Sequence, residues 1–318
     1  MSAKPLVVLT NPIHPQLLPV LEQQCEVVLA PDTQTETLSR LVADAEGLVV
    51  RAQLAPTLFD GAPRLRAVVR HGVGLDMIPV AAATARGIPV ANLPGSNTQA
   101  VAEYCLAAML HLRRRLAAMD RGLRNEGWAA ARPIADGCTE LRGSTCGIVG
   151  VGAVGARVAE IASALGMNVL GFTRRPDTLP AHVKAVDKRT LLAQADVVVL
   201  CCPLNDQTRG LIDAASVALM KNDAILINVS RGPVIEVAAV LAALHGGRLG
   251  GAALDVHDKQ PLTGKEALFD APNLLLTPHV AGITGTSMRA MSEGAVATLL
   301  ALLRGERPGN VVNPEVFK

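Results

Sequence analysis

The chain has 318 residues, half of them apolar and 18% charged, with a formal net charge of +2. This length suggests two domains of ordinary size, and the apolar content supports a large core and argues against disorder. The small net charge gives no global electrostatic case for binding nucleic acid, and no apolar run is long enough to span a membrane.

Short apolar runs alternate with helical stretches through the first hundred residues. Strands are expected at 6–10, 26–29, 47–51, 67–70 and 88–91, with helices at 15–24 and 35–45 among the segments between them. This alternation predicts a small parallel α/β unit.

The fourth of these strands is followed by the turn Arg-His-Gly-Val-Gly-Leu-Asp, residues 70–76. Its two glycines allow consecutive backbone N–H groups to face an anion. An ordinary glycine turn is the alternative interpretation of this stretch taken alone.

Residues 97–115 carry apolar side chains on one helical face and end in three arginines, which suit the C-terminal end of a helix. Residues 116–142 follow without a regular pattern and hold the only tryptophan, Trp128. We expect the first segment to be a long helix and the second to be irregular.

The remainder is organised around residues 145–155, Thr-Cys-Gly-Ile-Val-Gly-Val-Gly-Ala-Val-Gly. A buried strand is expected at 146–149, a helix at 156–165 and a second strand at 168–172. Between them, Gly150 permits a tight turn, Gly152 lets the backbone approach a pyrophosphate, and Gly155 lets the helix pack close to the strand. The helix N-terminus then offers unpaired N–H groups to the phosphates. A bare glycine motif is weak evidence, but the complete unit predicts dinucleotide binding.

Four more strands are expected at 197–200, 224–229, 252–255 and 274–277, with helices at 213–220, 235–244 and 286–304. Three of the strands lead into polar loops, which read Asn-Val-Ser-Arg-Gly (228–232), Asp-Val-His-Asp-Lys-Gln-Pro (255–261) and Thr-Pro-His-Val-Ala-Gly (277–282). Open α/β sheets bind ligands at the carboxyl ends of their strands. An arginine, an acid or amide and a histidine placed there can bind a carboxylate and move a proton.

The six cysteines, at positions 25, 105, 138, 146, 201 and 202, show no CxxC spacing, and several fall in expected buried elements. They favour reduced core thiols over a disulfide or a metal site, and we expect no metal. The N-terminus leads into a strand and does not resemble a signal peptide. These features favour the cytoplasm.

The four motifs, in the order GxGxxG, Asn-x-x-Arg-Gly, Leu-Asp-Val and Pro-His-x-Ala-Gly, resemble those of the D-isomer-specific 2-hydroxyacid dehydrogenase family. The resemblance covers essentially the whole chain, including Val73-Gly74 with Asp76 and the segment 97–103. It implies an α/β fold with a Rossmann-type doubly wound parallel sheet in a dinucleotide-binding domain, residues 98–285. A smaller flavodoxin-like α/β domain, residues 1–97 and 286–318, would bind substrate. The cleft between them would close on substrate, and the long helix with the Trp128 arm would make a homodimer.

The same resemblance implies the catalytic roles. Arg231 would bind the substrate's carboxylate and carbonyl oxygen through its planar fork. His279 would give a proton to the carbonyl oxygen as hydride arrives, although a structural histidine is the commoner fate of a lone histidine. Gln260 completes the catalytic set, and His71 and His257 flank the expected cleft. The substrate-binding residues implied in this way are Arg51, His71, Val73, Gly74, Arg231 and His279.

The cofactor contacts also follow from the resemblance, with Asp255 expected to orient the nicotinamide carboxamide. The full set is Gly150, Gly152, Ala153, Val154, Gly155, Thr173, Arg174, Arg175, Cys202, Pro203, Thr208, Val229, Ser230, Arg231, Asp255, His279 and Gly282.

One departure from the family pattern lies at the end of the second Rossmann strand. NAD-using members carry an acid there, whereas this chain reads Phe-Thr-Arg-Arg at 172–175. An arginine would hold the 2′-phosphate that an acid repels, so we expect NADP(H) to be preferred. The alternative is a pair of solvated arginines and use of NAD(H).

The other departure is Gln260, where most members carry a glutamate paired with the histidine. Glutamine can hydrogen-bond an imidazole but adds no charge, and formate dehydrogenases of the same superfamily also have glutamine here. The leading interpretation is an NADP(H)-preferring reductase of small 2-oxoacids, such as glyoxylate or hydroxypyruvate. A formate- or phosphite-type dehydrogenase is the runner-up, and a non-catalytic nucleotide-sensing scaffold of the corepressor type is a third possibility.

Overall fold

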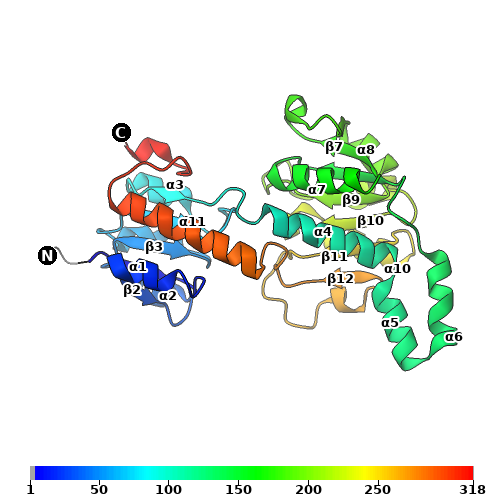
Figure 1. The fold of residues 1–318 in the computed structure, drawn as a ribbon, viewed down its shortest axis with the longest axis horizontal. Helices are drawn as coiled ribbons and strands as arrows, with labels where there is room; N and C mark the ends of the chain where they lie inside the picture. The colour runs from blue at the N-terminus through cyan, green and yellow to red at the C-terminus, as the bar shows by residue number, and fades with distance from the viewer. Residues whose placement is uncertain (1–3, 318) are drawn as a thin grey trace. The chain divides into compact units, whose positions relative to one another are not determined.

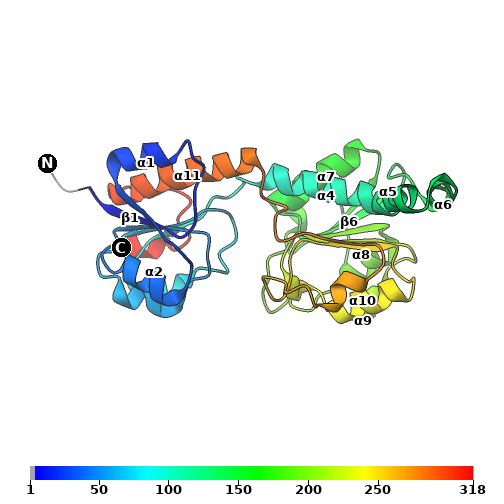
Figure 2. The ribbon, with the colours of Figure 1, turned by 90° about the horizontal axis from the view of Figure 1, so that it is seen from below.

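The computed structural model describes residues 4–317, which divide into two compact units. One unit combines the chain up to residue 97 with the chain from residue 283, and the other comprises residues 98–282. Each unit is a parallel sheet with helices on both faces (Figure 1 and Figure 2). This confirms the predicted fold class. No helix within residues 4–317 is both long enough and apolar enough to cross a membrane.

The first unit has five parallel strands in the order β2-β1-β3-β4-β5, which is the flavodoxin-like order. One face packs on helices α1 and α11, and the other packs on α2 and α3. The strands are β1 (Leu6–Leu9), β2 (Glu26–Leu29), β3 (Gly47–Val50), β4 (Ala67–Arg70) and β5 (Val90–Ala91). The helices are α1 (Leu18–Gln24), α2 (Thr35–Val42), α3 (Val80–Ala85), α11 (Gly285–Leu303) and the 3-10 turns η1 (Pro56–Gly61) and η6 (Pro314–Phe317).

Helix α11 returns the chain to the first unit and begins at a capping box. The hydroxyl of Thr284 accepts from the backbone N–H of Ser287, and the hydroxyl of Ser287 accepts from the N–H of Thr284. Met291, Ala295 and Leu299 then pack in the same apolar cluster as strands β1, β3 and β4. The last helix of the sequence thereby completes the core that the first strands began.

The second unit has seven parallel strands in the order β12-β11-β10-β9-β6-β7-β8. The order reverses between β6 and β9, which is the switch point where doubly wound sheets bind dinucleotides. The strands are β6 (Thr145–Val149), β7 (Asn168–Phe172), β8 (Lys184–Ala185), β9 (Val197–Leu200), β10 (Ile225–Asn228), β11 (Gly251–Leu254) and β12 (Leu274–Leu276).

Helices cover both faces of this sheet, with α4 and α7 on one face and α8, α9 and α10 on the other. Their bounds are α4 (Thr98–Arg113), α7 (Ala153–Ala164), α8 (Lys188–Gln194), α9 (Ala214–Leu219) and α10 (Val237–His245). The 3-10 turns of this unit are η2 (Arg132–Gly137), η3 (Pro176–Thr178), η4 (Gly232–Val234) and η5 (Ala267–Asp270).

The segment 116–142 was expected to be irregular, and that expectation was wrong. It forms helix α5 (Leu116–Asn125), helix α6 (Trp128–Ala131) and the turn η2. Arg115, with a left-handed φ of 49°, separates α5 from α4. Of the residues in α5 only Gly122 is buried, so this helix contributes little to the core of its unit. Figure 1 shows α5 and α6 as an arm beside the sheet of their unit.

Candidate active site

The glycine loop between β6 and α7 has the backbone that a phosphate site requires. Gly150 has φ of 88°, and a Cβ there would lie 2.7 Å from the Cα of Cys202. A Cβ on Gly155 would lie 2.3 Å from the carbonyl oxygen of Gly150. Gly152, in contrast, is exposed and within the described chain has no atom within 4 Å of its Cβ position. The loop is therefore tight where helix and strand meet and open at the helix N-terminus, where a phosphate binds.

The residues after β7 place two cations at the end of the second strand of this sheet. Arg174 and Arg175 are both exposed, and in the part of the chain that the structure describes neither forms an ion pair. The turn is held by the Arg175 N–H, which donates to the Thr173 hydroxyl at 3.3 Å. Both guanidinium groups can therefore receive an anion.

Arg231 follows β10 on a loop shaped by the buried amide of Asn228. The Asn228 Nδ2 donates to the Arg231 carbonyl at 2.9 Å, and its Oδ1 accepts from the N–H and the hydroxyl of Ser230 at 3.0 and 2.7 Å. Arg231 Nη1 donates to the Ser230 carbonyl at 2.6 Å. A Cβ on Gly232 would lie 2.2 Å from the carbonyl carbon of His257, so the loop after β10 packs directly on the loop after β11. The sequence pattern contained Asn228 and Gly232 but did not reveal these supporting roles.

Gln260 lies in the loop after β11 and His279 lies in the loop after β12, and their side chains meet at the carboxyl edge of the sheet. The Gln260 Oε1 lies 3.1 Å from the His279 Nδ1, and the Gln260 Nε2 donates to the carbonyl of His257 at 3.2 Å. A carbonyl can only accept, so the NH₂ end of the amide faces His257 and the oxygen end faces the imidazole. His279 Nδ1 therefore carries a proton and donates it to Gln260.

Asp255 anchors the loop that carries His279. Its side chain is 1% exposed, and it accepts from the backbone N–H groups of Val280 and Ala281 at 2.8 and 2.9 Å and from the Thr277 hydroxyl at 2.6 Å. The His279 N–H also donates to the Asp255 carbonyl at 2.8 Å. These bonds hold His279 at φ of 58°, a conformation that non-glycine residues seldom adopt. This anchoring was not foreseen from the sequence, which suggested only a contact to the cofactor.

The other expected cofactor residues lie along the same edge, because the carboxyl ends of parallel strands share one edge of the sheet. In the loop after β9, the Thr208 hydroxyl donates to the Pro203 carbonyl at 2.7 Å and accepts from the Asn205 N–H at 2.8 Å. The residues gathered at this edge are Gly150, Gly152, Ala153, Val154, Gly155, Thr173, Arg174, Arg175, Cys202, Pro203, Thr208, Val229, Ser230, Arg231, Asp255, Gln260, His279 and Gly282.

The expected substrate residues of the first unit follow β3 and β4 at the carboxyl edge of the five-stranded sheet. Arg70 braces their turn, since its guanidinium donates to the carbonyls of Val50, His71 and Gly74 at 2.7 to 3.0 Å. Val73 is 37% exposed at the tip of the turn. Arg51 Nη1 donates to the Pro12 carbonyl at 2.9 Å, and burial lowers the pKa of Arg51.

His71 is buried, with 2% of its surface exposed, and its Nε2 lies 2.8 Å from the Ser292 hydroxyl. The Ser292 hydroxyl donates to the Met288 carbonyl, so the imidazole is the donor in its bond to Ser292. Burial, together with the charges of Arg51 and Arg70, lowers the pKa of His71 to about 4. His71 is thus a buried neutral imidazole that binds the turn after β4 to helix α11.

The six cysteines are free thiols, and burial is the main cause of the raised pKa at Cys25, Cys105, Cys146, Cys201 and Cys202. A desolvated thiol is a poor nucleophile and a poor metal ligand. Within residues 4–317 no group of three or more histidine, cysteine or acidic side chains is arranged to hold a metal ion.

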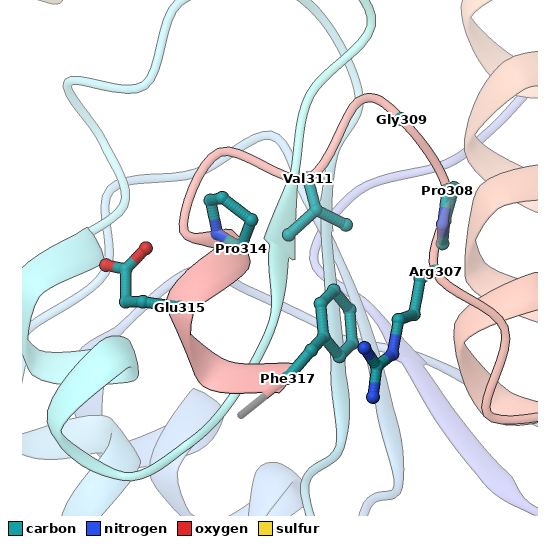
Figure 3. Close-up of a pocket in the computed structure, with 7 residues that line it drawn as sticks. All are labelled: Arg307, Pro308, Gly309, Val311, Pro314, Glu315 and Phe317. Atoms are coloured by element: carbon teal, nitrogen blue, oxygen red, sulfur yellow. The ribbon is translucent and has the colours of Figure 1, made fainter.

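A hollow of about 590 Å³ lies elsewhere, against the C-terminal segment of the first unit (Figure 3). Two of its lining residues lie against each other, with the guanidinium carbon of Arg307 5.2 Å from the centre of the Phe317 ring. Its lining contains none of the residues described above and no acid–base pair of the kind that His279 and Gln260 form. The residues that line it are Arg307, Pro308, Gly309, Val311, Pro314, Glu315 and Phe317.

A glycine-rich phosphate loop at the switch point, with an arginine after β10 and a histidine after β12 at the same edge of the sheet, defines the cofactor unit of a nicotinamide-dependent dehydrogenase. Residues 106–281 match the family model described as D-isomer specific 2-hydroxyacid dehydrogenase, NAD binding domain. The chain therefore belongs to the D-isomer-specific 2-hydroxyacid dehydrogenase family, as the order of its motifs predicted. It is an NAD(P)-dependent oxidoreductase that acts on a small molecule.

The similarity of this chain to relatives and to solved structures extends over nearly its full length. The glyoxylate reductase of Aeropyrum pernix is 35% identical, over 99% of this chain and 98% of that one. A Thermus thermophilus protein of known structure is 35% identical with a TM-score of 0.89, covering 96% of this chain and 99% of its own. The NADPH-dependent glyoxylate/hydroxypyruvate reductase of Sinorhizobium meliloti, solved with NADP and malonate, is 29% identical with a TM-score of 0.87 over 99% of both chains.

Proposed function

We propose that this enzyme reduces small 2-oxoacids, glyoxylate and hydroxypyruvate among them, to D-2-hydroxy acids, with NADPH as its preferred cofactor. The observation that carries the proposal is the bond of His279 Nδ1 to Gln260, which leaves Nε2 as the proton-exchanging nitrogen at the same sheet edge as Arg231 and the phosphate loop. The relatives named glyoxylate reductase, at 35% identity, support this choice of substrates.

A reduced nicotinamide cofactor, held by the glycine loop and the strand-end residues described above, would supply the hydride that the carbonyl carbon needs. The planar fork of Arg231 binds the carboxylate and the carbonyl oxygen, which fixes the substrate and polarises its carbonyl. His279 Nε2–H gives its proton to that oxygen as negative charge develops there. Gln260 keeps Nδ1 protonated throughout and fixes the plane of the ring.

The cofactor fits the cradle described above. Gly152 leaves room at the N-terminus of α7 for the pyrophosphate, and Ala153 and Val154 begin that helix. Asp255 is assigned to the nicotinamide carboxamide as well as to the His279 loop. We assign dinucleotide binding to residues 98–285.

Substrate binding is assigned to residues 1–97 and 286–318. The N–H groups of Val73 and Gly74 would hold a carboxylate oxygen, since the Arg70 guanidinium already occupies two carbonyl acceptors of the same turn, those of His71 and Gly74. Arg51 and His71 would line that position.

The preference for NADPH rests on Arg174 and Arg175. Two exposed guanidinium groups stand where NAD-using members of the family carry an acid, and they match the geometry of a 2′-phosphate. The Sinorhizobium meliloti relative is named NADPH-dependent.

Formate- or phosphite-type oxidation is the second candidate, because a neutral glutamine bonded to the histidine suits a reaction without a proton relay. A panel assay distinguishes the two. Glyoxylate, hydroxypyruvate, pyruvate and larger 2-oxoacids are offered with NADPH and with NADH, and formate and phosphite are offered with the oxidised cofactors. We expect turnover of a small 2-oxoacid to exceed formate and phosphite oxidation. The reverse ranking would establish the second candidate.

We also propose a cytoplasmic homodimer. The free thiols suit a reducing compartment. On the arm formed by α5 and α6, the side chains of Leu116, Leu123 and Trp128 are 48%, 49% and 73% exposed, and a second copy of the chain would cover them. Sedimentation should give a dimer for the wild type and a monomer for Leu116→Glu/Leu123→Glu. A wild type that is monomeric at micromolar concentration would exclude the dimer.

A further inference from the structure

Helix α4 reaches the loop that carries His279 through the hydroxyl of Tyr104, the only tyrosine of the chain. This hydroxyl lies 2.7 Å from the Thr277 Oγ1. The Thr277 Oγ1 in turn lies 2.6 Å from the Asp255 Oδ1, and the same Oδ1 accepts from the Val280 N–H at 2.8 Å. One continuous line of hydrogen bonds therefore runs from α4 to the residue that follows His279.

The donors in this line can be assigned. An ionised carboxylate only accepts, so the single hydroxyl proton of Thr277 points at Asp255. Tyr104 must then be the donor to the Thr277 oxygen. Burial, with the nearby negative charge of Asp255, raises the pKa of Tyr104 to about 12. The phenol consequently keeps its proton and its direction of donation over the whole range in which an enzyme is assayed.

The loop needs this support because His279 has a left-handed backbone, with φ of 58°. Such a conformation persists only where surrounding contacts over-determine it. The carboxylate of Asp255 provides most of these contacts. Because the Tyr104 hydroxyl polarises the Thr277 hydroxyl, the bond from Thr277 holds this carboxylate more firmly than it would without Tyr104. A further clamp on Thr277 comes from His257, whose Nε2 lies 3.0 Å from the Thr277 carbonyl.

We propose that Tyr104 and Thr277 are positioning residues for the reaction, which hold the Asp255 carboxylate so that His279 presents its Nε2 to the substrate oxygen. This inference rests on the proposed function of His279. Neither hydroxyl touches the reacting atoms in this account, so their loss should slow proton donation by His279 through the loss of its positioning.

The test compares Tyr104→Phe, Thr277→Val, Thr277→Ser and the double variant Tyr104→Phe/Thr277→Val. Tyr104→Phe keeps the ring in the core and should lower kcat about threefold to tenfold, which is the cost of one polarised hydrogen bond. Thr277→Val should lower kcat further, and Thr277→Ser, which retains the hydroxyl, should restore most of it. The melting temperature should stay near the wild-type value in Tyr104→Phe and Thr277→Ser. With deuterated cofactor, the isotope effect on kcat should rise in the slow variants, because the chemical step becomes rate-limiting.

The double variant tests whether Tyr104 and Thr277 act as one connected line of hydrogen bonds or as two independent contacts. If Tyr104 acts through Thr277, Tyr104→Phe should cost nothing in the Thr277→Val background. An unchanged kcat in Tyr104→Phe, or an equal loss in both backgrounds, would overturn the inference. The variant His279→Gln distinguishes failure of this inference from failure of the proposed function. It must lose activity if His279 is the acid, whatever the roles of Tyr104 and Thr277. Full activity in His279→Gln would overturn the proposed function itself.

Discussion

The Gln260 Oε1 accepts a hydrogen bond from the His279 Nδ1 at 3.1 Å, while the other end of the same amide is bound to the His257 carbonyl. The amide is thus held on both sides and cannot turn over without losing a bond. His279, to which we assign proton transfer, thus has a neutral, oriented partner, where the family pattern places a charged glutamate.

Replacing Gln260 by glutamate should therefore change the pH dependence of reduction. A carboxylate beside the imidazole favours its protonated form, and reduction requires that form. We expect the alkaline limb of kcat/KM to move to higher pH by about one unit in Gln260→Glu.

Lys259→Gln is the matched control, because it makes the same change of charge at the neighbouring exposed position. Its profile should overlay that of the wild type. A limb that stays in place in Gln260→Glu, in protein that still binds cofactor, would show that Gln260 does not tune His279.

The cofactor preference should depend on the two arginines after β7. If the two arginines bind the 2′-phosphate, kcat/KM for NADPH should fall about tenfold to hundredfold in Arg174→Ala/Arg175→Ala. This loss is equivalent to about 1.5–3 kcal/mol for a charge-assisted contact. The value for NADH should change little. Arg189→Ala, an exposed arginine on α8, serves as the control. Equal efficiency with the two cofactors in the wild type, unaltered in the double variant, would contradict the assignment.

Arg231→Lys tests the carboxylate clamp. Lysine keeps the charge but offers a point ammonium in place of the planar fork, so most activity should be lost, by roughly a hundredfold. Melting temperature should be preserved, and Arg209→Lys in the exposed loop after β9 should behave as the wild type. Near-normal kcat/KM in Arg231→Lys would mean that another group binds the carboxylate.

His71 should make the first unit sensitive to acid. Its pKa is lowered to about 4 in the folded chain, below the ordinary value of 6.5, so the unfolded chain binds more protons between these pH values. Stability should be full above pH 6.5 and should decline as pH falls toward 4, by roughly 3 kcal/mol from this residue.

Urea unfolding at pH 7 and pH 4.5 measures this effect. His71→Gln, which has no titrating group, should lose less stability between the two pH values than the wild type does. His182→Gln, at an exposed position, should lose as much as the wild type. Identical pH dependence in His71→Gln and the wild type would refute the assignment.

The fold was predictable because its strands are buried on both faces and therefore read as continuous apolar runs, as at β9 (Val197–Leu200). The phosphate loop was predictable because backbone geometry requires glycine at 150 and 155. Helix α5 was not predicted; it packs little against the core, with only Gly122 buried and with Leu116 and Leu123 about half exposed. The strand β8, with two residues, is too short to show a pattern.

The chemical groups of the site were visible in the sequence, but their supports were not. His279, Arg231 and Gln260 each follow a strand in a recognisable motif. The line from Tyr104 through Thr277 to Asp255 joins residues that are up to 173 positions apart, and only the fold brings them together. The buried state of His71 was also invisible, because a glycine turn exposes some residues and buries others without a sequence signal.

The most direct test of the account is the reduction of glyoxylate by NADPH at neutral pH in the wild type and in His279→Gln. We expect turnover by the wild type and a loss of roughly a hundredfold or more in the variant, with NADPH binding retained, because the variant cannot supply the proton. Absence of turnover on glyoxylate and the other 2-oxoacids by the wild type, or equal rates in the two proteins, would contradict the central claim.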